Sequence, residues 1–257
     1  MLLSSYLHLI IIGICVGFLS GLLGSGGTTF LVPALSAFFT YQLLLKVSYL
    51  HFAVYTALTI SALTSWTSIV KHFRYNWIKL SELLSIVPCL VAANLVGLFL
   101  SLHTPAILSI NLFSLFLLYL SYSILFNHNS ELLINKMTFL STWVGFKSGL
   151  FGISGGSIAF PYLLRMSIKL EKSLAITSII TFSLSIIGVI IGLLGGATHV
   201  KGAIGFIYWP AIIFVAPFTM LMAPVGQKVA LRCPVLFIKL IYSLVMLFSA
   251  LYILSSV

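Results

Sequence analysis

Two glycine-rich segments carry residue types that could bind a small anion. The first is Gly24-Ser25-Gly26-Gly27-Thr28-Thr29, and the second, 128 positions later, is Gly152-Ile153-Ser154-Gly155-Gly156-Ser157. Glycine lets a ligand approach the backbone without a Cβ in the way. Where such a turn opens a helix, free main-chain N–H groups and the positive end of the helix dipole attract an anion. The serine and threonine hydroxyls add further donors, so both segments are candidate anion-binding turns.

The two segments belong to a longer internal repeat. Residues 16–35 and 144–163 align without a gap and are identical at ten of twenty positions. Further along the chain the match continues at an offset of 129 residues, for example at Gly97 and Gly226. A period of half the chain indicates a duplicated domain. We therefore expect two structural repeats, 1–128 and 129–257, within one integral membrane domain.

The composition requires a lipid environment. Of the 257 residues 61% are hydrophobic and only 6% are charged, and the mean hydropathy is +1.21. Globular domains carry about 25% charged residues, so the bilayer must replace water around most of this surface. The net charge of +10 is spread between apolar stretches and forms no continuous basic face for nucleic acid. Three scattered cysteines have no metal-ligand spacing, and we expect no metal and no cofactor.

The predicted elements form the same series twice. A transmembrane helix needs about 20 apolar residues, and residues 1–45 lack charged side chains over twice that length. Glycines and a proline in the middle favour a helix over 6–23 and a shorter returning helix over 29–40, and 137–164 forms the second such hairpin. Spans follow at 46–71, 83–101, 105–126, 173–197, 204–226 and 234–255. The predicted fold is an all-α polytopic membrane protein with two inverted repeats, each a re-entrant broken hairpin plus three transmembrane helices.

The basic residues predict how these repeats cross the membrane. Lys and Arg concentrate in cytoplasmic loops. If each hairpin returns to its own side, ten basic residues share one side, and only Lys46 and Lys201 fall on the other. If each hairpin crosses once, the two sides carry similar numbers. The inverted arrangement is favoured, with both termini outside the cytoplasm. The ten are Lys71, Arg74, Lys79, Lys136, Arg165, Lys169, Lys172, Lys228, Arg232 and Lys239.

The glycines have two possible roles. Small residues four apart allow membrane helices to pack closely, and we expect this role for Gly17, Gly21, Gly145 and Gly149. For the paired glycines in the two turns, the same role competes with ligand binding. We favour ligand binding there, because two inverted copies bring two helix N-termini together near the membrane midplane.

Further polar residues lie inside the predicted membrane elements. Lys147 is the one charge within them, and an intramembrane ionisable residue is a functional candidate. Its long stem could reach the interface, but about ten residues of helix place it roughly 15 Å deep, so we favour a role in binding the anion. Thr177, Ser178, Asn94 and Gln227 are weaker candidate binding residues, and for each of them we favour hydrogen bonding between helices.

The motifs resemble those of the sulfite exporter family, the TauE/SafE-like permeases. The similar features are the glycine turns followed by an apolar stretch and Pro33 or Pro161, the His-x-basic segments at His72 and His199, and the two-repeat layout. The resemblance implies export of sulfite, sulfonates or related organosulfur anions across a bacterial inner membrane. The chain departs from the family pattern at Thr28 and Ser154, where glycine is usual.

Two alternative functions remain. A passive anion channel would use the same turns. An intramembrane serine protease would use Ser154 in its Gly-x-Ser-Gly setting with His199 as base, but a nucleophile and its base must lie within hydrogen-bond reach. These two lie at different predicted depths. The sequence also leaves open whether the chain forms a homo-oligomer.

The three acidic residues, Glu82, Glu131 and Glu171, lie in or beside the predicted cytoplasmic links, so no carboxylate is expected within the membrane.

Overall fold

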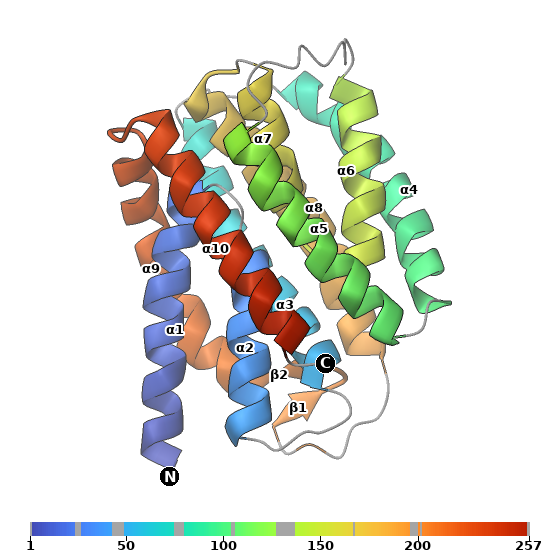
Figure 1. Cartoon of the computed structure of the whole chain (residues 1–257), viewed down its shortest axis with the longest axis vertical. Coiled ribbons are helices and arrows are strands. Elements are labelled where there is room, and N and C mark those ends of the chain that lie inside the picture. Colours follow the sequence, from blue (N-terminus) through green and yellow to red (C-terminus); the bar gives the residue numbers. More distant parts are fainter. Residues whose placement is uncertain are drawn as a thin grey trace.

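In the part of the chain that it describes, the computed structural model is a bundle of ten helices and one small β-hairpin (Figure 1). It describes residues 2–23, 27–42, 49–74, 80–103, 106–126, 137–166, 168–195, 200 and 202–255. The helices are α1 (Leu2–Leu23), α2 (Thr28–Gln42), α3 (Tyr49–Arg74), α4 (Leu80–Leu102), α5 (Ala106–Phe126), α6 (Met137–Phe151), α7 (Gly156–Arg165), α8 (Leu170–Leu194), α9 (Trp209–Ala230) and α10 (Val235–Ser255). Both termini lie in the lower half of Figure 1, and the α9–α10 connection lies at the opposite end from the N-terminus.

Several of these helices have the length and composition of membrane spans. Within the described residues, His51–His72, Leu170–Leu194 and Trp209–Ala230 are long and apolar enough to cross a bilayer, and parts of α1, α2, α4 and α10 are shorter apolar helices. The helices α2 and α7 have 15 and 10 residues, fewer than the roughly 20 that a span needs. The prediction of an essentially helical membrane protein is confirmed.

Close backbone packing joins two helix pairs, α1 with α9 and α4 with α6. A Cβ on Gly21 would collide with the main chain of α9, and a Cβ on Gly149 would collide with the main chain of α4. A Cβ on Gly17 or Gly145 would also come too close to the main chain of the same partner helices. The packing role predicted for these four glycines is confirmed.

The main helix pairs combine elements from both halves of the chain. Besides α1–α9 and α4–α6, helix α3 packs on α8 and α5 packs on α10. Helices α3 and α8 run antiparallel, because Ser178 meets His72 whereas a Cβ on Gly192 would touch Tyr55. The two halves therefore share one interior.

A short β-hairpin corrects the prediction that a span begins at residue 204. Strands β1 (Ala203–Ile204) and β2 (Ile207–Tyr208) pair antiparallel, and α9 begins only at Trp209 with a proline in its first turn. The turn residue Gly205 has φ +59°, a conformation that glycine adopts readily. The Tyr208 N–H donates to the Thr56 hydroxyl at 3.0 Å, which ties the hairpin to α3.

Candidate functional site

The second glycine turn joins α6 to α7 through two left-handed glycines. Gly152 has φ +66° and Gly155 has φ +71°. The Ile153 N–H donates to the Ser148 carbonyl at 3.2 Å, and the Ser148 hydroxyl donates to the Ile153 carbonyl. The Gly155 carbonyl accepts the first helical bonds of α7. The N–H groups of the two following residues, Gly156 and Ser157, therefore have no acceptor within the helix.

The first turn repeats this geometry where the structure describes it. Gly27 has φ +84°, and its carbonyl accepts the N–H groups of Phe30 at 3.0 Å and Leu31 at 2.8 Å. The first N–H groups of α2, at Thr28 and Thr29, are thus placed like those of α7. Two of the predicted site residues, Ser25 and Gly26, lie outside the described residues together with Gly24.

The two turns meet inside the molecule. The hydroxyls of Thr28 and Ser154 lie 2.6 Å apart, and the Ser154 N–H donates to the Thr28 hydroxyl at 3.2 Å. Thr29 and Ser157 form a second hydroxyl–hydroxyl hydrogen bond. All four side chains are fully buried. Residues from the two distant motifs thus form one polar cluster, which we call the hydroxyl pair site.

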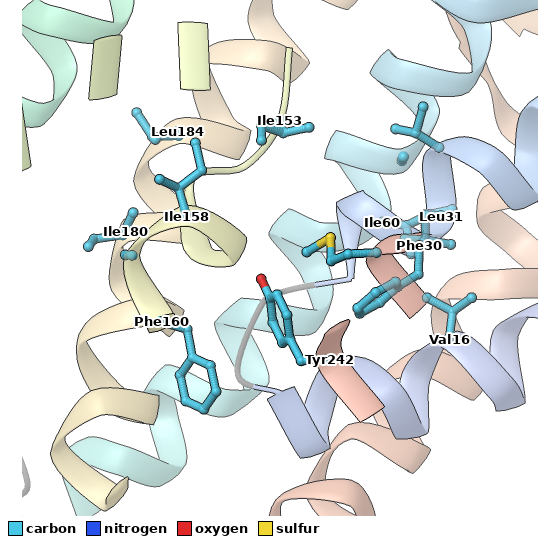
Figure 2. Close-up of a cluster of buried hydrophobic side chains, with 14 of the residues drawn as sticks. Val16, Phe30, Leu31, Ile60, Ile153, Ile158, Phe160, Ile180, Leu184 and Tyr242 are labelled. Carbon is cyan, nitrogen blue, oxygen red and sulfur yellow. The ribbon is translucent and has the colours of Figure 1, made fainter. Parts of the chain in front are cut away.

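Tyr242 of α10 covers this site, and sequence reasoning missed it. Its hydroxyl donates to the Ser157 carbonyl. Figure 2 shows its ring between Phe160 of α7 and Phe30 of α2, with ring centroids 6.2 and 6.4 Å away. The tyrosine contacts the opening turns of both short helices. A buried tyrosine hydroxyl needs a partner, but the sequence does not show which of the eleven tyrosines is buried.

Lys147 lies on α6 against aromatic rings. Its ammonium is 4.5 Å from the ring centroid of Trp143 and 5.1 Å from that of Phe116 on α5. Such cation–π contacts stabilise a cation that is partly removed from water. In the structure the Lys147 ammonium thus contacts these two rings, and its role as an anion partner stays a prediction.

Thr177 and Ser178 lie on α8 beside the second turn. The Thr177 hydroxyl donates to the carbonyls of Ser173 and Leu174, at 2.9 and 3.0 Å. The Ser178 hydroxyl lies 3.4 Å from His72 Nε2 on α3. It also donates to the Leu174 carbonyl at 2.8 Å. Both hydroxyls therefore bond to the backbone of α8, and Ser178 in addition lies near His72.

The weaker candidates serve helix packing and a polar network. Asn94 donates from Nδ2 to the Gly145 carbonyl at 3.3 Å, which bridges α4 and α6 as expected. Gln227 joins side chains of α3. Neither has a recorded contact with the hydroxyl pair site.

The chemistry of the meeting point suits an anion. It combines four hydroxyls with the first N–H groups of two helices, and all of these can donate hydrogen bonds. Within the described residues, no group of three His, Cys, Asp or Glu side chains could hold a metal ion. The geometry therefore favours recognition of hydrogen-bond acceptors.

Comparison with known proteins agrees with the resemblance. The model of the family described as "Sulfite exporter TauE/SafE" matches residues 9–253. A "Probable membrane transporter protein" of Methanocaldococcus jannaschii is 30% identical over 224 residues, which cover 84% of this chain and 80% of the relative. A "Probable membrane transporter protein" of Haemophilus influenzae is 22% identical over 240 residues, 90% of each chain. No solved structure matches the chain significantly.

Proposed function

The chain belongs to the sulfite exporter TauE/SafE family, and from this premise we propose that it is a permease for small organosulfur anions such as sulfite and sulfonates. The family and the curated relatives are membrane transporters. The chain is accordingly an integral membrane transporter and not an enzyme, so Ser154 is not the nucleophile of a protease. The substrate class and its binding site form the proposal.

One observation carries the proposal, which is that the two repeated turns lie in contact. The Thr28–Ser154 hydroxyl distance of 2.6 Å joins the start of α2 to the turn before α7. Two helix N-termini directed at one point add their partial positive charges. An oxyanion held there would accept bonds from main-chain N–H groups and hydroxyls, as anions do at other helix N-termini.

We propose that the halves are inverted repeats and that each turn is re-entrant. Two features support this arrangement. Thr29 and Ser157 are equivalent positions, 128 residues apart, and hydrogen-bond to each other, as residues beside a two-fold axis would. The equivalent helices α3 and α8 pack antiparallel. In inverted-repeat transporters, substrates bind at such a repeat interface near the midplane.

In this structure the hydroxyls of the site satisfy one another. An anion must therefore replace the Thr28–Ser154 and Thr29–Ser157 bonds with bonds to its own oxygens. Each hydroxyl can rotate to donate a hydrogen bond to the anion. The anion also needs space between the hydroxyls, so the two turns must separate slightly. We propose that the two turns separate during transport and that Tyr242 keeps its hydrogen bond to the Ser157 carbonyl as they move.

Transport by purified protein in proteoliposomes tests the proposal. Uptake of sulfite, taurine, thiosulfate and sulfate is measured for the parent and for Thr28→Val with Ser154→Ala. A hydrogen bond contributes about 1 kcal/mol net, and 1.4 kcal/mol corresponds to a factor of ten. We expect sulfite transport to fall about five- to ten-fold in the double variant.

A matched control is available in the same chain. The hydroxyls of Ser121 and Ser243 also form a buried pair, at 2.8 Å between α5 and α10, and their double alanine variant should keep transport. Equal transport by the turn variant and the parent would overturn the proposed site. Flux that rises linearly with sulfite concentration, without counterflow, would indicate a passive channel in place of a carrier.

A further inference from the structure

A second polar cluster lies where α3, α8 and α9 meet at the Lys71 end of α3. Lys71 Nζ donates to Gln227 Oε1 at 3.3 Å, and Gln227 Nε2 donates to Ser68 Oγ at 3.3 Å. His72 Nε2 lies 3.4 Å from Ser178 Oγ and 3.5 Å from Gln227 Nε2. We call these five residues the lysine cluster.

The lysine cluster carries positive charge in a largely buried setting. Its four other side chains are only 2–6% exposed, and Lys71 is half-buried. Within the described residues, no carboxylate is paired with Lys71, and the charge that acts on its ammonium is a second cation, Lys228. Burial of a charge without a counter-ion is unfavourable, and a bound anion would remove this penalty.

Two orphan hydroxyls connect this cluster to the glycine turn. Thr181 and Ser185 are fully buried, and neither hydroxyl has a hydrogen-bond partner in the described part of the chain. Both follow Ser178 at helical spacing on the face of α8 that meets α3. A Cβ on Gly155 would lie 2.6 Å from Leu184, so this stretch of α8 also borders the second turn. Buried hydroxyls without partners call for an explanation. An anion located between the lysine cluster and the second turn would supply an acceptor for each of them.

We propose that the lysine cluster is a second oxyanion site, distinct from the turns. Lys71 supplies the charge and the Gln227 amide supplies a neutral hydrogen-bond donor. The Ser178 hydroxyl can donate to the anion once it gives up its bond to the Leu174 carbonyl at 2.8 Å. From here the anion passes along Thr181 and Ser185 to the hydroxyl pair site. The class of anion expected at this site rests on the proposed function. The existence of the site is tested by anion binding alone and does not require transport.

Counting the bound anions on purified protein tests this site. Equilibrium dialysis with radiolabelled inorganic sulfate uses a stable tetrahedral oxyanion as the probe. We expect two sulfates per parent chain and one for Lys71→Gln. Lys71→Arg keeps the charge and should retain both. Lys239→Gln removes an equal charge on α10 and should also retain both. Gln227→Glu provides a second test, because a carboxylate beside the Lys71 ammonium replaces the anion and should leave one sulfate.

The turn variant Thr28→Val with Ser154→Ala separates the two proposals. If the parent binds one sulfate that this variant removes and Lys71→Gln keeps, the second site is wrong and the turn site stands. Binding of both sulfates by Lys71→Gln and by Gln227→Glu also overturns the second site. If the parent binds one sulfate that only the Lys71→Gln change removes, the second site stands and the turn site is wrong.

Discussion

The hydroxyls of Thr29 and Ser157 hydrogen-bond to each other, although the residues are 128 positions apart in the chain. They occupy the same place in the two copies of the repeat, one residue into α2 and α7 respectively. Equivalent residues can touch only where the two copies face one another. This contact therefore explains why the motif occurs twice, because each copy contributes half of one polar cluster.

Substituting a glycine of the turns and substituting a glycine of the helix contacts should have different effects on stability and binding. A side chain at Gly155, with φ +71°, forces the residue into a left-handed conformation that costs about 1–2 kcal/mol. The nearest obstacle to its Cβ is the movable end of Leu184 at 2.6 Å. We expect Gly155→Ala to fold with slightly lower stability and to bind sulfite weakly, as measured by thermal unfolding and by binding to purified protein.

Gly21→Ala is the contrasting variant. Its Cβ would collide with the main chain of Ala223, which cannot move without separating α1 from α9. Overpacking of this kind costs about 1–3 kcal/mol, so we expect less folded protein but unchanged affinity in the fraction that folds. A Gly155→Ala protein that binds sulfite as tightly as the parent would show that this glycine serves the fold alone.

Repetition and spacing made much of this arrangement predictable. The packing role of Gly17 and Gly145 could be inferred because small residues recur at helical spacing in both halves, and the turn glycines were recognisable for the same reason. Tyr242 could not be found in this way, since its counterpart at the offset that aligns Gly97 with Gly226 is Phe113, which has no hydroxyl. The contacts of His72 with Ser178 and Gln227 likewise join residues far apart in sequence, and no local pattern predicts them.

Lys147 tests whether a charge contributes to the anion site. We expect Lys147→Met to weaken sulfite binding several-fold and Lys147→Arg to retain most of it, because both Lys and Arg carry a positive charge while Met does not. Binding to purified protein measures the effect. Trp143→Leu is the control for the lysine's contact at 4.5 Å, since it removes the ring and keeps the charge. Parental binding by Lys147→Met would assign the lysine to packing against Trp143 and Phe116.

The proposed inverted topology can be tested with a cysteine already in the chain. Cys233 lies in the α9–α10 connection, beside Arg232, in a link that the basic residues assign to the cytoplasm. In a Cys15→Ser, Cys89→Ser protein, we expect a membrane-permeant maleimide to label Cys233 in intact cells and an impermeant one to leave it unlabelled. Reporters fused to both termini should be active only outside the cytoplasm.

Single cysteines in the 71–82 and 165–172 links complete this test. The inverted arrangement requires both links to share the side of Cys233, whereas parallel halves place them on opposite sides. Labelling of just one of the two links by the impermeant reagent would rule out inverted repeats. The antiparallel packing of α3 and α8 would then need another explanation.

The acidic residues suggest how transport is driven. Glu171 lies in the first turn of α8, and Glu82 and Glu131 lie in or beside the predicted cytoplasmic links. Coupled carriers commonly place a carboxylate within the membrane as a proton relay or ion ligand. Export of an anion down an inside-negative potential needs no such group, since one charge moving outward yields about 2.3 kcal/mol per 100 mV. We therefore expect Glu82→Gln, Glu131→Gln and Glu171→Gln, singly or together, to retain most sulfite transport in proteoliposomes.

The same reasoning predicts that the membrane potential sets the rate. A potassium gradient with valinomycin imposes the potential, and reversing its sign should reverse the direction of net sulfite flux in vesicles with equal sulfite on both sides. Protein-free vesicles provide the leak control. If a folded Gln variant loses transport, that carboxylate takes part in the mechanism despite its place outside the predicted spans. If flux ignores the potential but follows a pH gradient, the anion moves together with a proton. In that case the carrier of the proton is His51, Lys147 or the substrate itself, because no carboxylate is predicted within the membrane.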